Sequence, residues 1–329
     1  MADEARVLVT GASGFVGSHL LRRLIAQGRL VRALRHRAGP LQLPADDGVE
    51  WLEADLNSSD PAGFTRGVGC VFHLAGLSLF SGSTADAARM EALNVQATLR
   101  LARACKLAGV RQFVFVSSVA ACEEAANAEV DEDNGHPVSD YGRSKWRAEQ
   151  ELRPLSDANF AVTILRPSAL FGEFHHGSVC DMARAIQRGR FALIGRGANR
   201  VNFYYIEDFI DVLHAVAGDP RAYARTFIAA DEPQPLRDFV AAAASELRPG
   251  WRVPELPATL GWTLAAGCDL LSPILRRPLP LSRRRVRAMT RDLAYLNRRL
   301  SAELGLCPRV GWRDGLRRSI AWYRASGAL

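Results

Sequence analysis

A short apolar run, a glycine turn and an amphipathic stretch open this chain and limit the folds it can adopt. Residues 6–10 are rich in β-branched and leucine side chains, and residues 18–26 have helical periodicity. Further strand candidates lie at residues 30–34, 49–52, 70–74, 113–116 and 162–165, with the clearest helical patterns at residues 90–108 and 141–152. Strands that alternate with helices predict an α/β fold, a parallel sheet with helices on both faces. Ligands of such a sheet bind at the carboxyl ends of its strands.

The alternation stops after about residue 170, which predicts a change of architecture. The features that follow are two proline-rich stretches and two helical patterns, at residues 254–257, 273–280, 236–247 and 312–323. We expect residues 1–170 to form the sheet domain and residues 171–329 to form most of a smaller, mostly helical lobe that caps it. The two parts are expected to interleave through a strand near residues 200–230, at Phe203 to Ile206, that returns to the sheet.

The chain has 329 residues and a net charge of +7, with positive charge gathered late in arginine clusters. These clusters are residues 276–277, 283–285, 298–299 and 317–318. They could attract phosphates, nucleic acid or an anionic membrane. Without a nucleic-acid-binding motif, we expect a solvated basic face and no nucleic-acid partner. The six scattered cysteines predict no metal site, and together with a start unlike a signal peptide they indicate a cytoplasmic protein.

Three glycines recur every third residue between the first strand and the first helix. Tight backbone turning and exposed amides at a helix N-terminus can hold a pyrophosphate. Because this fold binds dinucleotides at its first strand–helix unit, we predict a dinucleotide here. An ordinary strand-to-helix turn is the alternative, since the spacing departs from the commoner G-x-G-x-x-G. The expected contacts come from Gly11, Ser13, Gly14, Phe15, Val16 and Gly17.

The end of the second strand indicates which dinucleotide is preferred. An acidic residue there would accept a hydrogen bond from the adenosine ribose and repel a 2′-phosphate. This chain has Arg35-His36-Arg37 instead. We therefore predict NADP over NAD, with Arg35 the leading phosphate partner and Arg37 the second, against the alternative of ordinary surface arginines. Asp55 and Leu56, after the third strand, could contact the adenine amino group, although an aspartate there is also a common helix cap.

Only two lysines occur in the chain, Lys106 and Lys145, and the second lies four positions after Tyr141. At that spacing on a helix the two side chains share a face, so the ammonium can favour the ionised phenol and lower its pKa. A phenol with a lowered pKa is a usable proton carrier. A chance pair on a solvated helix face is the alternative.

Six motifs follow one another at separations typical of one enzyme family. They are Thr10-Gly-x-x-Gly-x-x-Gly17, Asp55-Leu56, His73-Leu-Ala-Gly76, Val116-Ser-Ser118, Tyr141-x-x-x-Lys145 and Leu165-Arg-Pro167. With them the chain resembles the extended short-chain dehydrogenase/reductase family over nearly its whole length. The resemblance implies a nicotinamide dinucleotide on a Rossmann-type, doubly wound parallel sheet, a C-terminal substrate lobe and, in many members, a homodimer.

The same resemblance implies roles for individual residues. Ser118 corresponds to the catalytic hydroxyl that orients the substrate oxygen, and Tyr141 to the proton donor or acceptor. Lys145 corresponds to the amine that lowers the pKa of this tyrosine and holds the nicotinamide ribose. Asn94 matches a family position, although ordinary hydrogen bonding within a helix would explain it equally well. The other implied cofactor contacts are Leu74, Ala75, Gly76, and Pro167 to Leu170.

Departures from the sugar-nucleotide members of the family favour a different substrate. Val119-Ala120 stand where similar dehydratases have an Asp-Glu pair, so dehydration is not expected. The segment Val201-Asn-Phe-Tyr-Tyr-Ile-Glu-Asp208 lacks in register the arginine with which similar epimerases grip a diphosphate, although Arg200 is adjacent. Tyr205-Ile206 in this segment and the ending from Glu303 to Trp322 resemble the 3β-hydroxysteroid dehydrogenase and 2-alkyl-3-oxoalkanoate reductase branch. The apolar residues 256–281 suit an apolar substrate.

These observations predict an NAD(P)-dependent oxidoreductase that interconverts a ketone and a secondary alcohol on a largely apolar small molecule, steroid-like or β-keto-acid-like. A sugar-nucleotide epimerase of the same family is one alternative, and a non-catalytic NADP-binding sensor or scaffold is another. Residues 256–281 could form the core of their own lobe, or could rest on a membrane and collect a lipid-like substrate from it.

Overall fold

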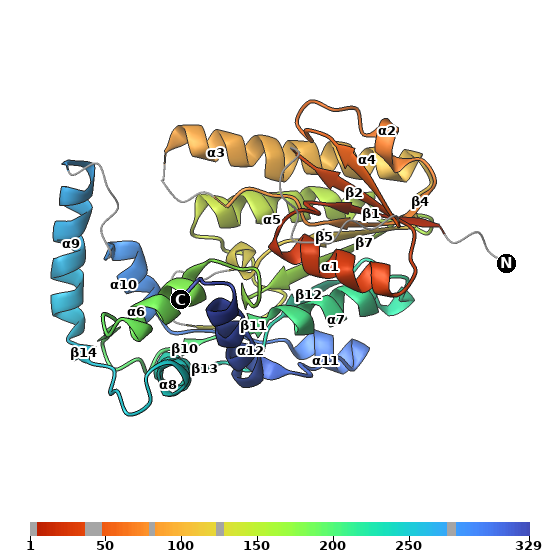
Figure 1. Cartoon of the computed structure of the whole chain (residues 1–329). Helices are drawn as coiled ribbons and strands as arrows, with labels where there is room; N and C mark the ends of the chain where they lie inside the picture. The colour runs from red at the N-terminus through yellow and green to blue at the C-terminus, as the bar shows by residue number, and fades with distance from the viewer. Residues whose placement is uncertain (1–4, 37–47, 79–82, 123–127, 275–280) are drawn as a thin grey trace.

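A seven-stranded parallel sheet organises the protein, of which the computed structural model describes residues 5–36, 48–78, 83–122, 128–274 and 281–329 (Figure 1). Its strands are β1 (Arg6–Thr10), β2 (Val31–Arg35), β3 (Val49–Glu53), β4 (Val68–His73), β5 (Gln112–Val116), β7 (Ala161–Pro167) and β12 (Thr226–Ala229). They lie in the order β12-β7-β5-β4-β1-β2-β3, with every neighbouring pair parallel. The chain changes its direction of travel across the sheet between β1 and β4, which is where a doubly wound sheet binds its ligands. The predicted α/β, Rossmann-type fold is confirmed.

Helices cover both faces of the sheet because its strands alternate their side chains between two apolar cores. In β1, Val7 and Val9 belong to one core together with Leu20, whereas Leu8 belongs to the other together with Leu101. The first core is covered by α1 (Phe15–Ala26) and α7 (Ile206–Val216), and the second by α2 (Ala62–Thr65), α4 (Thr98–Leu107) and α5 (Asp140–Leu152).

The helix before β5 is longer than predicted. We expected it to begin near residue 90, but α3 (Thr84–Met90), the π-helical η1 (Glu91–Ala97) and α4 follow one another without a gap. Ser83 caps α3 by accepting a hydrogen bond from the N–H of Asp86. Turns of π-helix are rare and occur frequently at functional sites.

The second half of the chain is largely helical. Its other helices are α6 (Ser178–Gln187), α8 (Leu236–Leu247), α9 (Ala258–Ile274), α10 (Arg283–Thr290), α11 (Arg298–Leu304) and α12 (Gly311–Ala325). Two short strand pairs link this half to segments that follow β5 and β7: β6 (Ala128–Val130) with β15 (Leu293–Tyr295), and β8 (Ala169–Phe171) with β11 (Phe203–Tyr205). Two more lie within this half: β9 (Leu193–Ile194) with β14 (Glu255–Leu256), and β10 (Arg200–Val201) with β13 (Gln234–Pro235). Within the described residues, no helix is both long and apolar enough to cross a membrane.

The strand that returns to the main sheet lies near the end of the expected region, residues 200–230, and not at Phe203 to Ile206. The run that begins at Phe203 forms β11, which pairs with β8 outside the main sheet. The returning strand is β12, which pairs in parallel with the second half of β7. The aromatic residues of β11 serve packing instead: Tyr204 and Tyr205 are buried in the first core, and Gly315 of α12 approaches the Tyr205 ring so closely that a Cβ there would lie 2.5 Å from it.

Two aspartates anchor α12 to the rest of the protein. The carboxylate of Asp208 accepts hydrogen bonds from the three successive backbone N–H groups of residues 309–311, at 2.8–2.9 Å. Asp231 accepts from the N–H of Trp312 at 2.7 Å. Both aspartates are buried, and carboxylates at a helix N-terminus satisfy amides that have no partner within the helix. Asp208, which ends the segment compared above with epimerases, therefore has a structural role.

Candidate active site

The glycine turn after β1 is held in place by close backbone contacts. Gly11 has φ +65°, and a Cβ there would lie 2.9 Å from the backbone nitrogen of Ala75. A Cβ on Gly17 would lie 2.3 Å from the carbonyl oxygen of Gly11, so only glycine lets α1 approach the turn. Ser13 and Gly14 are exposed at its tip.

The start of α1 has the properties of an anion site. Its N-cap residue is Gly14, and among the residues that the structure describes no side chain caps the helix. The first amides of a helix lack partners within it, and the helix dipole favours negative charge near them. Phe15 and Val16 are half-buried, and the Phe15 ring stacks on His175 with 4.4 Å between centroids. An uncapped helix behind an exposed glycine turn fits the pyrophosphate of a dinucleotide.

His73 joins the glycine turn to the loop after β4. Its Nδ1 lies 2.8 Å from Oγ1 of Thr10, and its Nε2 lies 2.8 Å from Oγ1 of Thr98. Burial, assisted by the charge of Lys145, lowers the pKa of His73 to about 3, so the ring is neutral. Thr10 Oγ1 accepts from the N–H of Ala75 at 3.2 Å, which leaves its own proton for His73. Neither threonine was predicted to make a contact: Thr10 opens the glycine motif but was given no role of its own, and Thr98 belongs to none of the six motifs.

The structure brings Ser118 and Tyr141 together at the carboxyl end of β5. Ser118 lies between β5 and the 3₁₀ turn η2 (Val119–Ala121), and Tyr141 lies in the first turn of α5. Their side chains are hydrogen-bonded. Gly142 permits this approach, because a Cβ there would lie 2.1 Å from the carbonyl oxygen of Ala120. The residue after the tyrosine must therefore be small for the helix to reach the serine.

The amine of Lys145 lies beside the same strand end. Its Nζ donates to the carbonyl oxygen of Val116 at 2.9 Å and lies 4.8 Å from the centroid of the Phe115 ring. The residue is 4% exposed, and this burial lowers the pKa of Lys145 to about 8, although the charge of Glu149 opposes the shift. A Cβ on Gly76 would lie 3.1 Å from Nζ, so the loop after β4 passes directly over the amine.

The pKa of Tyr141 is shifted in the opposite direction from the prediction. We expected the ammonium of Lys145 to lower it. Burial instead raises the pKa of Tyr141, and its hydrogen bond with Ser118 opposes that rise. The ammonium of Lys145 donates its hydrogen bond to the Val116 carbonyl oxygen. The phenol is therefore protonated at neutral pH, which is the form that donates a proton.

Asn94 holds two parts of the site in register. Its Oδ1 accepts from the N–H of Leu77 at 2.7 Å, and its Nδ2 donates to the Leu77 carbonyl oxygen and to Oγ of Ser144, both at 2.9 Å. The side chain is completely buried in the π-helical turn. These contacts reach a loop and another helix, so the alternative of hydrogen bonding within its own helix is wrong. They make Asn94 a positioning residue for the loop after β4.

A buried ion pair supports the strand ends beneath Ser118. Arg166 donates to Glu149 through Nε at 3.0 Å and Nη2 at 2.7 Å, and Ser117 Oγ donates to the same carboxylate at 2.5 Å. Arg166 is 1% exposed and Glu149 is completely buried. The pair joins β5, α5 and β7, and Nη1 of Arg166 extends it to the carbonyl oxygens of Glu132 and Asn134.

The predicted adenosine contacts lie at the ends of β2 and β3. Arg35 ends β2, with its guanidinium carbon 5.6 Å from the centroid of a Trp51 ring, and its Nε is buried without a hydrogen-bond partner in the described part of the chain. Such a donor is costly unless a ligand satisfies it. Arg37 lies outside the described residues. Asp55 follows β3, and its carboxylate accepts from the N–H of Asn57 at 2.9 Å, as in an Asx turn.

Several other predicted contacts occupy the same edge of the sheet. Leu56 lies three positions beyond the end of β3 and is buried, and Leu74 follows β4 directly and is half-buried. Pro167 ends β7 and is buried, whereas Leu170 lies in β8 opposite Tyr204. All of them lie at or just beyond the carboxyl ends of main-sheet strands, where this fold binds its ligand.

Residues 7–228, which extend from β1 into β12, match the model of the NAD dependent epimerase/dehydratase family. The chain belongs to this family. The predicted membership of the extended short-chain dehydrogenase/reductases is thereby confirmed. Members of this family bind a nicotinamide dinucleotide, and the glycine turn and uncapped helix of this chain fit one.

Relatives of this family member include a reductase and an epimerase. The chain is 28% identical to the 2-alkyl-3-oxoalkanoate reductase of Stenotrophomonas maltophilia, over 95% of this chain and 98% of the relative. It is also 28% identical to the N-acetyl-alpha-D-glucosaminyl-diphospho-ditrans,octacis-undecaprenol 4-epimerase of Escherichia coli O157:H7, over 85% and 84%. The structure of MoeE5 in complex with UDP-glucuronic acid and NAD is 27% identical, with a TM-score of 0.77 over 98% of this chain and 99% of that one.

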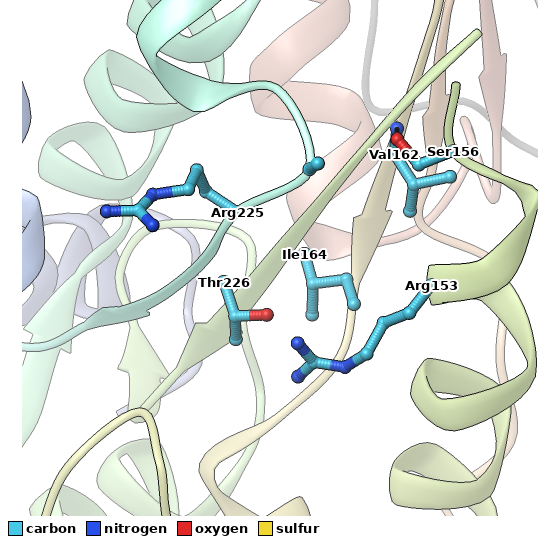
Figure 2. Close-up of a pocket in the computed structure, with 7 residues that line it drawn as sticks. Arg153, Ser156, Val162, Ile164, Arg225 and Thr226 are labelled. Carbon is cyan, nitrogen blue, oxygen red and sulfur yellow. Dashed lines mark hydrogen bonds between the residues drawn. The ribbon is translucent and has the colours of Figure 1, made fainter.

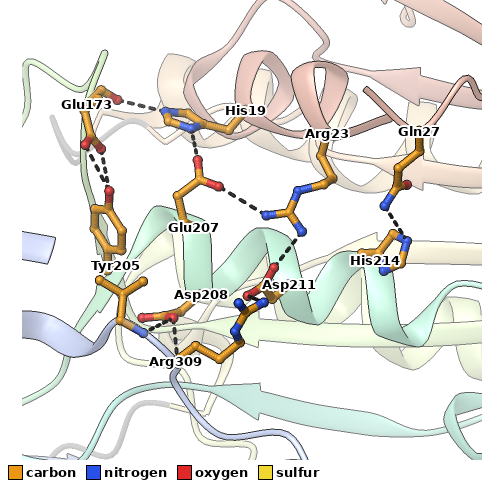
Figure 3. A network of polar contacts seen from close by, with 11 residues as sticks. His19, Arg23, Gln27, Glu173, Tyr205, Glu207, Asp208, Asp211, His214 and Arg309 are labelled. Atoms are coloured by element: carbon orange, nitrogen blue, oxygen red, sulfur yellow. Dashed lines mark hydrogen bonds and ion pairs between the residues drawn. The ribbon is translucent and has the colours of Figure 1, made fainter. Parts of the chain in front are cut away.

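In this family member a polar network ties α1 to α7 (Figure 3). His19 Nδ1 lies 2.7 Å from Oε1 of Glu207, and its Nε2 lies 3.0 Å from the carbonyl oxygen of Glu173. Arg23 donates to Asp211 at 2.7 Å and to Glu207 at 3.3 Å. The helix that carries the glycine turn is thus fixed to the second half of the chain. Sequence patterns give no signal for these contacts, whose partners are more than 150 positions apart.

A small pocket near the start of β7 is separate from this site (Figure 2). It is lined by Arg153, Ser156, Val162, Ile164, Ala224, Arg225 and Thr226. None of these is a predicted site residue, and Pro167, at the carboxyl end of β7, is not among them. The cavity volume of about 30 Å³ is room for roughly two water molecules. It is too small for a substrate of the expected size, so we assign it no part in the chemistry.

Proposed function

We propose that the protein is an NADP-dependent oxidoreductase that interconverts a ketone and a secondary alcohol on a largely apolar substrate. The observation that carries the proposal is the hydrogen-bonded pair of Ser118 and Tyr141, with Lys145 on the same helix face, at the carboxyl ends of the sheet. Family membership and the similarity to a reductase support it.

The chain's own residues would handle the substrate oxygen and its proton. Ser118 Oγ holds the carbonyl oxygen by donating a hydrogen bond, and the protonated phenol of Tyr141 delivers the proton that completes the alcohol. In the reverse direction the phenolate accepts that proton. Lys145 lies one helical turn further along, where its ammonium can donate to a ribose hydroxyl. A bound nicotinamide dinucleotide would supply or accept the hydride at the carbonyl carbon.

Tyr141→Phe tests the role of the phenol. We expect turnover to fall by at least about a hundredfold, as for loss of a general acid, while the dissociation constant for NADP stays the same. Tyr223→Phe, a half-buried tyrosine in another part of the fold, is the matched control and should keep full activity. Retained turnover in Tyr141→Phe would refute the assigned role. Tight NADP binding without turnover on a broad carbonyl panel would instead favour the non-catalytic sensor or scaffold.

The preference for NADP rests on Arg35. Its buried Nε without a partner in the described residues and its place at the end of β2 suit a 2′-phosphate. Arg35→Gln should raise the KM for NADP about tenfold or more, since a charge-assisted hydrogen bond is lost, and leave the KM for NAD nearly unchanged. Equal or better use of NAD by the native protein would overturn the preference. The MoeE5 structure holds NAD, so both cofactors belong in the assay.

A sugar-nucleotide epimerase is the second candidate, because one of the relatives is a sugar 4-epimerase. One observation weighs against it here. Arg200, the arginine nearest the diphosphate-gripping position of similar epimerases, already donates to Asp292 at 3.1 Å and to Glu129 at 2.9 Å. An epimerase would carry bound cofactor through purification and show no net change in nicotinamide absorbance with substrate, whereas the proposed reductase consumes NADPH in step with the ketone.

A further inference from the structure

The helix α9 packs on the protein through its small residues. Gly261 lies against Ile194, where a Cβ would approach a side-chain carbon to 2.4 Å, and Ala265 is completely buried. Ile194, Ala265 and Val286 of α10 form a small apolar cluster of their own, separate from the two cores of the sheet. Small side chains make a thin contact, because each buries little apolar area.

The large apolar residues of α9 are exposed instead. Leu260, Leu264 and Leu271, which share one face at positions i, i+4 and i+11, are 44%, 47% and 49% exposed. Trp262 is 36% exposed and Leu270 is 70% exposed. An ordinary surface helix directs such residues at the core and its polar residues at water. Large contiguous apolar surface on a folded protein marks a binding surface.

The charge that borders α9 on the side of α10 is mainly positive. Its only ionisable side chain other than a cysteine is that of Asp269, and Arg283 lies 3.3 Å from it. The next helix, α10, carries Arg283, Arg285 and Arg287, all exposed, and no acidic residue. The two helices contact each other and stand at the edge of the molecule farthest from the N-terminus (Figure 1). An apolar face bordered by arginines therefore projects from one end of the protein.

We propose that α9 docks on the surface of an anionic lipid membrane. Leu260, Leu264 and Leu271 would enter the boundary between headgroups and acyl chains, and the arginines of α10 would lie among the phosphates. The helix would lie on the membrane, since none in the described residues can cross one. A second copy of the chain fits the surface less well, because a symmetric contact would bring two sets of α10 arginines together. This inference goes beyond the proposed reaction and does not depend on it.

Flotation of the purified protein with lipid vesicles tests the proposal. The native protein should float with vesicles of equal parts phosphatidylcholine and phosphatidylglycerol, and far less with phosphatidylcholine alone. Its binding to the anionic vesicles should weaken as salt is added. If the native protein does not float with the anionic vesicles, the proposal is wrong. The assay needs no substrate or cofactor, so failure of the proposed reaction and failure of membrane docking are distinguishable.

Exposed positions allow substitutions that leave the fold intact. The double variant Leu264→Gln/Leu271→Gln should bind the anionic vesicles at least about tenfold more weakly. Leu107→Gln is the matched control, because Leu107 is 90% exposed on α4, and should bind like the native protein. Arg285→Gln and Arg287→Gln should each weaken binding about fivefold.

Two outcomes of the same series would contradict the proposal. One is undiminished vesicle binding by the double leucine variant, which would place the contact elsewhere. The other is a native dimer that dissociates in that variant while neither protein floats. Sedimentation velocity on both proteins detects this second outcome and would assign the surface to a second copy of the chain.

Discussion

Replacing Lys145 with methionine should change how the stability of the protein depends on pH. Burial lowers the pKa of Lys145 from its usual 10.5 to about 8, so below about pH 8 the folded protein holds an ammonium away from water. Because the pKa is depressed in the folded state, the unfolded chain binds more protons between about pH 8 and pH 10.5. The free energy of unfolding contributed by this group therefore rises with pH across that window, by about 3 kcal/mol in all.

The methionine variant lacks the titrating group and serves as the reference. Between about pH 7 and about pH 9.5, the linkage relation gives the native protein a gain of about 2 kcal/mol over Lys145→Met. Loss of the hydrogen bond to the Val116 carbonyl oxygen also changes the free energy of unfolding of the variant, but by the same amount at both pH values. The part of the difference that changes with pH therefore comes from titration of the amine. Urea unfolding of both proteins at the two pH values, without added cofactor, measures this difference.

Lys106 supplies the matched control, as the chain's other lysine. Its side chain is 35% exposed and its Nζ lies 2.7 Å from Asp157. The difference in free energy of unfolding between the native protein and Lys106→Met should not show the same gain. If the Lys145→Met difference is the same at both pH values, the amine is not desolvated in the folded protein, and the argument from burial fails.

Two further substitutions test the supports of the site. Glu149→Gln should lower the free energy of unfolding by about 3–5 kcal/mol, because it leaves the Arg166 guanidinium buried without its carboxylate; a loss below about 1 kcal/mol in urea unfolding would contradict this. Gly17→Ala should weaken NADP binding at least about tenfold in calorimetric titration, because its Cβ would lie 2.3 Å from the Gly11 carbonyl oxygen and displace α1. Gly63→Ala, where a Cβ meets nothing within 4 Å, should bind NADP like the native protein.

Much of the fold could be predicted because its signals are local. A buried parallel strand is a short apolar run, and each predicted run in the first 170 residues overlaps a strand of the main sheet. The helix predicted over residues 236–247 has the same bounds as α8. The glycine spacing was informative for the same reason, since Gly11 and Gly17 meet neighbours only a few positions away or in the adjacent loop.

The features that could not be predicted depend on partners far apart in the sequence. The run at Phe203 has the composition of a strand, but nothing in it specifies pairing with β8 instead of β7. The spacing of Tyr141 and Lys145 shows that they share a helix face, but not that the amine is directed at the Val116 carbonyl oxygen. The buried contacts of Asn94 likewise depend on three segments that meet only in the folded protein.

The contacts of Asn94 join the loop after β4 to α5. One amide side chain grips the backbone of Leu77 on one side and the hydroxyl of Ser144, three residues beyond Tyr141, on the other. A ligand that binds at the carboxyl ends of the strands and displaces the loop after β4 would therefore also displace α5, and the phenol of Tyr141 would move with it. Through this one side chain, ligand binding beside the loop and the position of the Tyr141 phenol depend on each other.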